Sequence, residues 1–186
     1  MIFNKHYNLR GKHATLSASK YHWINYTPEK MEQIIRNEAA KALGTRMHEF
    51  ASEAIEMGIK LPSRTKKTLN LYINDAIGYR MTPEQVLWYS DRVFGTADAI
   101  SYNGKLLRIH DLKTGVTPAS PHQLEIYAAL FCLEYDVKPG SIDIELRIYQ
   151  NDEVLIHIPE VVEIIHIMDR IVAYDKLIEQ IQNEGV

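Results

Sequence analysis

The chain has 186 residues, of which 46% are hydrophobic and 24% charged, and its formal net charge is −3. These values are typical of one folded domain with its own core, so we expect a single domain over residues 1–186. One cysteine, Cys132, excludes an internal disulfide framework and a four-cysteine metal or iron–sulfur site. Because no stretch reaches the roughly 18–20 apolar residues of a membrane span, we expect a cytoplasmic protein with no membrane partner.

Helical patterns fill the first part of the chain. A short helix is predicted within residues 16–24, and a long one over residues 27–59 with Thr27 as N-cap and Pro28 in the first turn. A further helix is predicted over residues 64–80.

The hydrophobic period then changes to that of strands. The remaining elements are strands over 84–91, 93–102 and 105–114, a helix over 120–136 capped by Ser120, strands over 141–150 and 153–159, and a helix over 160–182. The dipeptide Asn151-Asp152 between the last two strands predicts a hairpin. This order predicts an α/β (α+β) fold, in which helices pack on the faces of a central sheet of about five strands.

The dipeptide Asn103-Gly104 predicts a second hairpin with a two-residue type I′ turn, which needs positive φ at both central positions. Counting outward from that turn gives three cross-strand pairs: Tyr102 with Lys105, Asp98 with Ile109, and Thr96 with Asp111.

This hairpin carries three charged residues within apolar strand patterns. Residues directly opposite each other share a face, as do residues two apart on one strand, so we expect Asp98, Asp111 and Lys113 on one side of the sheet. Two carboxylates that close oppose joint ionisation, and a shared Mg²⁺ or Mn²⁺ ion would resolve the conflict. The alternative to a metal site is a structural Asp–Lys ion pair on a solvated sheet face, and the hairpin by itself favours neither interpretation.

Five motifs in order give the chain a family resemblance. They are "LSASKYHWI", "GTRMHEF", "GTAD", "DLKTG" and "HQLEIYAALF", between about residues 15 and 150. In this order they resemble the PD-(D/E)XK nuclease superfamily, in its RecB-like and phage-exonuclease branch, with Ala97 where the name-giving proline often stands. The resemblance implies a restriction-endonuclease-like αβββαβ core with a mixed sheet.

The resemblance also implies a set of site residues. The metal ligands would be His48, Asp98, Asp111 and the backbone carbonyl of Leu112. The catalytic lysine would be Lys113, with Asp98 and Asp111 as the catalytic acids and Gln123 and Tyr127 as the helix motif beside them.

Three further polar residues have weaker assignments. Glu84 stands where some relatives carry an acid, although an ordinary charge at a strand edge explains it equally. His110 is interpreted as a packing residue on the opposite sheet face. His122 begins the predicted helix and could reach a substrate.

The function implied by the resemblance is a metal-dependent DNA nuclease, an exonuclease of phage-type recombination, repair or replication. The alternatives are a structure-specific or restriction-like endonuclease and a non-catalytic nucleic-acid-binding protein that retains the fold. DNA is the expected partner. The resemblance is also compatible with a homo-oligomer and with a single-strand-binding or recombinase partner. The chain lacks both the cysteines of iron–sulfur relatives and the Walker sequence of helicase relatives.

Overall fold

The computed structural model of the chain describes residues 4–62 and 67–185. It divides into two compact units, Met1–Leu43 and Gly44–Val186. The expectation of one nuclease domain over residues 1–186 stays a prediction.

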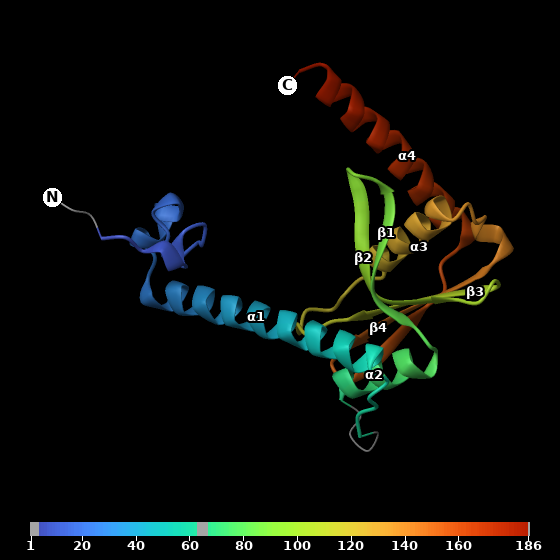
Figure 1. Cartoon of the computed structure of the whole chain (residues 1–186), viewed down its shortest axis with the longest axis horizontal. Helices are drawn as coiled ribbons and strands as arrows, with labels where there is room; N and C mark the ends of the chain where they lie inside the picture. The colour runs from blue at the N-terminus through green and yellow to red at the C-terminus, as the bar shows by residue number, and fades with distance from the viewer. Residues whose placement is uncertain (1–3, 63–66, 186) are drawn as a thin grey trace. The chain divides into compact units, whose positions relative to one another are not determined.

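The first unit contains short helical segments, η1 (Tyr7–Leu9) and η2 (Ala18–Asn25), and the beginning of α1 (Pro28–Glu56) (Figure 1). The Thr27 hydroxyl accepts a hydrogen bond from the backbone N–H of Lys30 at 3.3 Å, which confirms the predicted helix start. None of the described residues 4–43 is buried. The described residues of this unit therefore form no buried core of their own.

The second unit contains the sheet and the remaining elements. In chain order these are the end of α1, α2 (Thr68–Gly78), β1 (Thr82–Ser90), β2 (Val93–Tyr102), β3 (Leu106–Leu112), α3 (His122–Glu134), η3 (Pro139–Ser141), β4 (Asp143–Gln150), β5 (Glu153–His157) and α4 (Val161–Asn183). The strand order is β1-β2-β3-β4-β5, with β3 and β4 parallel and the other neighbours antiparallel. The α/β class and the five-stranded mixed sheet are confirmed.

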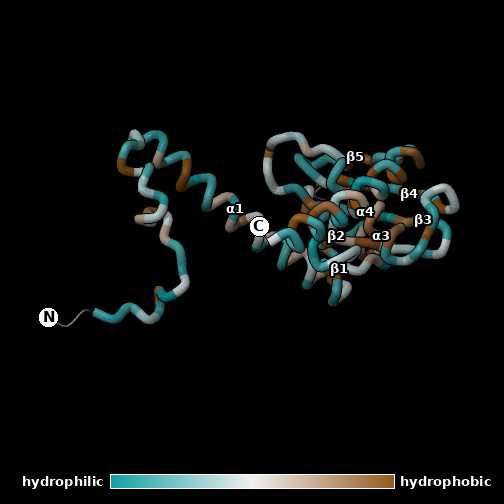
Figure 2. Tube along the Cα trace, turned by 90° about the horizontal axis from the view of Figure 1, so that it is seen from above, coloured by the Kyte–Doolittle hydropathy of each residue, from teal (hydrophilic) through white to brown (hydrophobic). Residues whose placement is uncertain are grey.

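Helices cover both faces of this sheet. One core cluster joins the strands to α3 and α4, and includes the buried residues Leu107, Ile109 and Leu124. The other joins them to α2 and the last turns of α1, and includes Tyr72 and Tyr149. Figure 2 shows strongly hydrophobic residues along the strands and α3 of this unit.

The Asn103-Gly104 hairpin forms, but its predicted register is wrong. Tyr102 pairs with Leu107 rather than with Lys105, and residues 103–106 make the turn. Gly104 has φ of +91°, whereas Asn103 stays outside the positive-φ region that a type I′ turn requires. The Asn103 side-chain oxygen instead accepts hydrogen bonds from the backbone N–H groups of Lys105 (3.0 Å) and Leu106 (2.9 Å).

At every pair of this hairpin, the observed partner on β3 lies two residues further along the chain than the predicted one. Ile109 faces Ile100 instead of Asp98. Continuing the observed ladder by one step brings Asp98, rather than Thr96, opposite Asp111. Because side chains alternate between faces with a period of two, a two-residue shift leaves each residue on its expected face.

The second predicted hairpin is confirmed as a two-residue turn. Gln150 pairs with Glu153, and both turn residues, Asn151 and Asp152, have positive φ, of 52° and 62°. Pro121 occupies the N-cap position of α3 in place of the expected Ser120, although the Ser120 hydroxyl still accepts a hydrogen bond from the backbone N–H of His122 at 3.4 Å. The helix predicted over residues 64–80 corresponds to α2, and its predicted start at residue 64 lies outside the described residues.

In the parts of the chain that the structure describes, no helix has both the length and the apolar character that crossing a bilayer requires.

Candidate metal centre

Three carboxylates form a row across the first three strands. Pairing of Pro83 with Ala99 and of Gln85 with Ala97 brings Glu84 opposite Asp98. The corrected register of the next hairpin brings Asp98 opposite Asp111. Like charges at this spacing oppose each other's ionisation, so the row favours a cation beside it.

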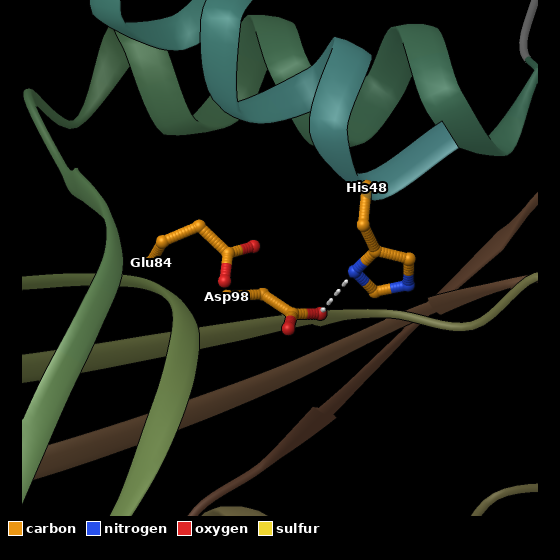
Figure 3. Close-up of side chains that lie close together, drawn as sticks. All are labelled: His48, Glu84 and Asp98. Atoms are coloured by element: carbon orange, nitrogen blue, oxygen red, sulfur yellow. Dashed lines mark ion pairs between the residues drawn. The ribbon is translucent and has the colours of Figure 1, made fainter. Parts of the chain in front are cut away.

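The end of α1 adds an imidazole to this row. His48 Nδ1 lies 3.4 Å from Asp98 Oδ2, and ligand atoms of His48, Glu84 and Asp98 all lie within 4.8 Å of one another. Figure 3 shows the three side chains converging from α1, β1 and β2. One helical turn before His48, Gly44 allows close packing, because a Cβ there would lie 2.8 Å from the Thr114 hydroxyl.

Lys113 approaches the row from the end of β3. Its Nζ donates to Asp111 Oδ1 and to Gln123 Oε1, both at 2.9 Å. The Gln123 amide in turn donates to the Tyr127 hydroxyl at 2.8 Å. The four side chains therefore form a continuous hydrogen-bonded chain from β3 to α3.

The position of Tyr127 depends on a glycine in β2. A Cβ at Gly95 would lie 2.7 Å from Cε1 of the Tyr127 ring, closer than real Cβ contacts allow. The glycine of the "GTAD" motif therefore leaves room for the tyrosine that supports Gln123.

Several groups of this cluster have shifted pKa values. The hydrogen bond to Asp98 raises the pKa of His48, and burial opposes that shift. Burial raises the pKa of Asp111, the charge of Asp98 raises it further, and Lys113 offsets part of the shift. Burial and the Asp98 charge also raise the pKa of Glu84. Each carboxylate shift reports a negative charge that is incompletely compensated.

Asp111 is the most deeply buried carboxylate of the row. The residue is 2% exposed, and its Oδ2 is a buried oxygen without a hydrogen-bond partner among the described residues. A buried carboxylate oxygen without a hydrogen-bond partner is costly, and coordination of a cation is one way to satisfy it. Oxygen donors with a single imidazole suit Mg²⁺ or Mn²⁺.

The side chains expected at the site lie close to one another, whereas the expected role of the Leu112 carbonyl has no contact to support it. His48 contacts Asp98, and hydrogen bonds join Asp111, Lys113, Gln123 and Tyr127. The two groups are near enough for the charge of Asp98 to raise the pKa of Asp111. The backbone N–H of Leu112 donates to Asp98 Oδ2 at 2.8 Å. Its carbonyl as a metal ligand stays a prediction.

The structure gives Glu84 a larger part than the sequence suggested. It lies inside β1 rather than at its edge, and its φ of +47° is in the left-handed region that non-glycine residues rarely adopt. Such a conformation persists only where the surroundings impose it, and it is frequent at functional sites. No hydrophobic pattern signals a left-handed residue within a strand.

The two further histidines lie outside this cluster. His110 is fully buried, 3.3 Å from the Tyr149 hydroxyl, and burial lowers the pKa of its imidazole to about 3. His110 therefore contributes to packing, as expected. His122 Nδ1 lies 2.9 Å from Glu125 Oε2 and belongs to a different group of side chains.

Comparisons with protein-family models, with curated proteins and with solved structures found no match for this chain. The likeness to the PD-(D/E)XK nucleases therefore rests on the motifs alone and remains a prediction.

Proposed function

We propose that the protein is a metal-dependent DNA nuclease, and more narrowly an exonuclease. The observation that supports this proposal best is the convergence of three carboxylates, an imidazole and an ammonium group: Glu84, Asp98, Asp111, His48 and Lys113. Phosphodiester hydrolysis requires a cation site, an activated water and a positive group for the phosphate, and this set offers ligands and charge for each.

The carboxylates of Asp98 and Asp111 and the imidazole of His48 would hold the metal, with Glu84 as a further acid beside them. A bound Mg²⁺ or Mn²⁺ ion would supply a water of lowered pKa and would polarise a phosphoryl oxygen. Asp111 Oδ2 and the Glu84 carboxylate are the groups whose charge such an ion would compensate.

Lys113 would act on the phosphate or on the attacking water. Its ammonium is oriented by Asp111 and Gln123, and Tyr127 fixes Gln123 from α3. Asp111 and Lys113 therefore act as one unit, in which the acid serves both the metal and the amine. Gln123 and Tyr127 are positioning residues in this arrangement.

The choice of DNA, and of cleavage from an end, rests on the resemblance of the five motifs to the RecB-like and phage-exonuclease branch. A phosphodiester backbone also matches the chemistry of a carboxylate-bound hard cation next to a lysine. A homo-oligomer, a single-strand-binding or recombinase partner, and a cytoplasmic location belong to the same proposal.

The test uses two DNA substrates. Purified protein is incubated with end-labelled linear duplex and with covalently closed circular DNA, in Mg²⁺ or Mn²⁺ and in EDTA. The proposal expects metal-dependent loss of the linear DNA and an intact circle. Nicking of the circle would instead indicate an endonuclease, and two intact substrates would indicate a non-catalytic binding protein.

A matched pair of variants assigns the activity to the cluster. Asp111→Asn should abolish cleavage, because it removes the buried carboxylate. Asp143→Asn changes an exposed aspartate at the beginning of β4 and should cleave like the wild type. Equal cleavage by both variants would reject the assignment of Asp111.

A further inference from the structure

A second group of histidines and glutamates lies where α3, β5 and α4 meet. The first turn of α3 carries His122 and Glu125, and the first turns of α4 carry Glu163 and His166. Each pair is three residues apart, so its two members share one face of their helix. His157, the last residue of β5, adds a third imidazole.

Glu125 is the buried centre of this group. Its side chain is 7% exposed, with Oε1 2.8 Å from His157 Nε2 and Oε2 2.9 Å from His122 Nδ1. Among the ion pairs of the described residues, those of Glu125 are with these two histidines. Both carboxylate oxygens of Glu125 therefore face imidazole nitrogens, which are themselves common metal ligands.

Glu163 brings a second carboxylate to the same place. Its Oε2 accepts a hydrogen bond from the backbone N–H of Glu160 at 3.0 Å, within the capping box that begins α4. Ligand atoms of Glu125, His157 and Glu163 all lie within 4.8 Å of one another. Four ligands around a zinc ion stand roughly 3.3–3.5 Å apart, so small side-chain movements would complete such a site.

A cavity of about 530 Å³ gives access to these groups. His122, Glu125, Glu163 and His166 line it together with the apolar residues Ile126, Val162 and Ile167. The apolar wall leaves the histidines and glutamates as the groups of the cavity that an ion could bind. The histidines that line the cavity can thus reach an ion held by the other side chains.

We propose that Glu125, His157 and Glu163, completed by an imidazole of His122 or His166, bind a transition-metal ion of the zinc class. Mixed imidazole and carboxylate ligands suit zinc, and a divalent ion would replace the direct contacts that Glu125 now makes with His122 and His157. The ion would tie together the ends of α3, β5 and α4. This site does not depend on the proposed nuclease function, because it uses none of the residues of the first cluster.

The experiment measures zinc binding in a full-length Asp98→Asn background, which weakens the first cluster as a competing site. After chelation and dialysis, zinc is titrated against a competing chelator, and Co²⁺ absorption reports the coordination geometry. The Asp98→Asn protein should bind one zinc ion. Adding His157→Ala or Glu163→Gln should weaken zinc binding by about 100-fold or more and change the Co²⁺ spectrum.

His13→Ala is the matched control, because His13 is an exposed histidine of the first unit. It should leave zinc affinity unchanged. Glu163→Gln keeps a side-chain oxygen for the Glu160 N–H, so this variant should fold even if His157→Ala does not. Unchanged affinity in Glu163→Gln and in folded His157→Ala, or no zinc bound by Asp98→Asn, would overturn the proposal and leave an ordinary hydrogen-bonded cluster.

Discussion

The two polar clusters of the second unit combine the same residue types in opposite proportions. The cluster at β1, β2 and β3 has three carboxylates, one imidazole and the ammonium of Lys113. The cluster at α3, β5 and α4 has two carboxylates and three imidazoles. Oxygen ligands favour hard cations such as Mg²⁺, whereas imidazoles favour zinc. The ratio of acids to histidines therefore distinguishes the metals that the two sites would select.

The lysine marks a second difference between the clusters. Lys113 brings a positive charge to the first cluster, where an anionic substrate would need one, and no lysine or arginine pairs with Glu125 in the described part of the second. A cation beside a metal serves chemistry on an anion, whereas a cavity lined by histidines serves ion binding. Variants of the first cluster test whether its charged groups serve catalysis in this way.

Beyond the Asp111→Asn test, the largest effect is expected for Lys113→Ala. Loss of the ammonium should lower the cleavage rate of linear DNA by at least about 10²–10³-fold, because one positioned charged donor contributes that much to a transition state. Initial rates with end-labelled duplex in Mg²⁺ measure it. Lys105→Ala, at an exposed position in the first hairpin, is the control and should retain the rate. Near wild-type cleavage by Lys113→Ala would show that the lysine is only structural.

Gly95→Ala should have the next largest effect. Its Cβ would collide with the Tyr127 ring, which would displace Gln123 and misdirect Lys113. Misplacement of a reacting group by about 1 Å costs on the order of 100-fold in rate, so we expect a loss of about 10- to 100-fold in kcat.

The control for this variant is Gly78→Ala, where a Cβ would meet nothing within 4 Å. Thermal unfolding separates a local displacement from a general loss of structure. If folded Gly95→Ala cleaves at the wild-type rate, the hydrogen-bonded chain through Tyr127 has no part in catalysis.

Glu84→Gln should change the metal requirement more than the maximal rate. Removing one acid beside Asp98 and His48 should raise the Mg²⁺ concentration for half-maximal cleavage by about 10-fold, as loss of a supporting group at a metal site typically does. Cleavage as a function of Mg²⁺ concentration measures this shift. Glu56→Gln, at the exposed end of α1, is the comparison variant. An unchanged metal requirement would exclude Glu84 from the site.

The smallest effect concerns the stability of the metal-free protein. Burial raises the pKa of Asp111, so the folded state binds this proton more tightly than the unfolded state does. The contribution to stability is thus full at pH values below the unfolded pKa of about 4 and is lost as the pH rises through the higher folded pKa. Asp111→Asn has no carboxyl group to ionise at this position, so its stability does not fall in this way as the pH rises.

In EDTA at neutral pH, Asp111→Asn should therefore unfold a few degrees above the wild type, since ~1 kcal/mol corresponds to about 2–4 °C in a chain of this size. The difference should shrink as the pH falls towards 4. Asp143→Asn should show no such trend. A lower unfolding temperature for Asp111→Asn at neutral pH would mean that the Lys113 ion pair already compensates the buried charge.

The two hairpins show how far local sequence predicts geometry. The bounds of β2 follow from its apolar pattern and match residues 93–102. Asn151-Asp152 forms the expected two-residue turn, whereas Asn103 uses its side chain to hold two backbone N–H groups and widens the other turn. This competition between side chain and backbone is not visible in a dipeptide. The grouping of Asp98 with Asp111 was nevertheless predicted, because a two-residue shift preserves the face.

The remaining parts of both sites depend on tertiary structure. Glu84 joins the first cluster through a left-handed backbone angle within a strand, which no period indicates. The second cluster assembles from α3, β5 and α4, and Glu125 looks like a helix-surface acid in sequence. The spacings His122-x-x-Glu125 and Glu163-x-x-His166 were the available signal. Each is common in solvated helices, so the spacing gains meaning only when the helices are seen together.

The two hydrogen bonds of the Lys113 ammonium affect how it would bind an anionic ligand. An ammonium group carries three N–H bonds, and Asp111 and Gln123 engage two of them in the described structure. Rotation about the terminal Cε–Nζ bond is then locked, and the third N–H has a fixed direction. An incoming anion would find a donor whose rotational entropy has already been lost during folding, and its arrival would cost correspondingly less.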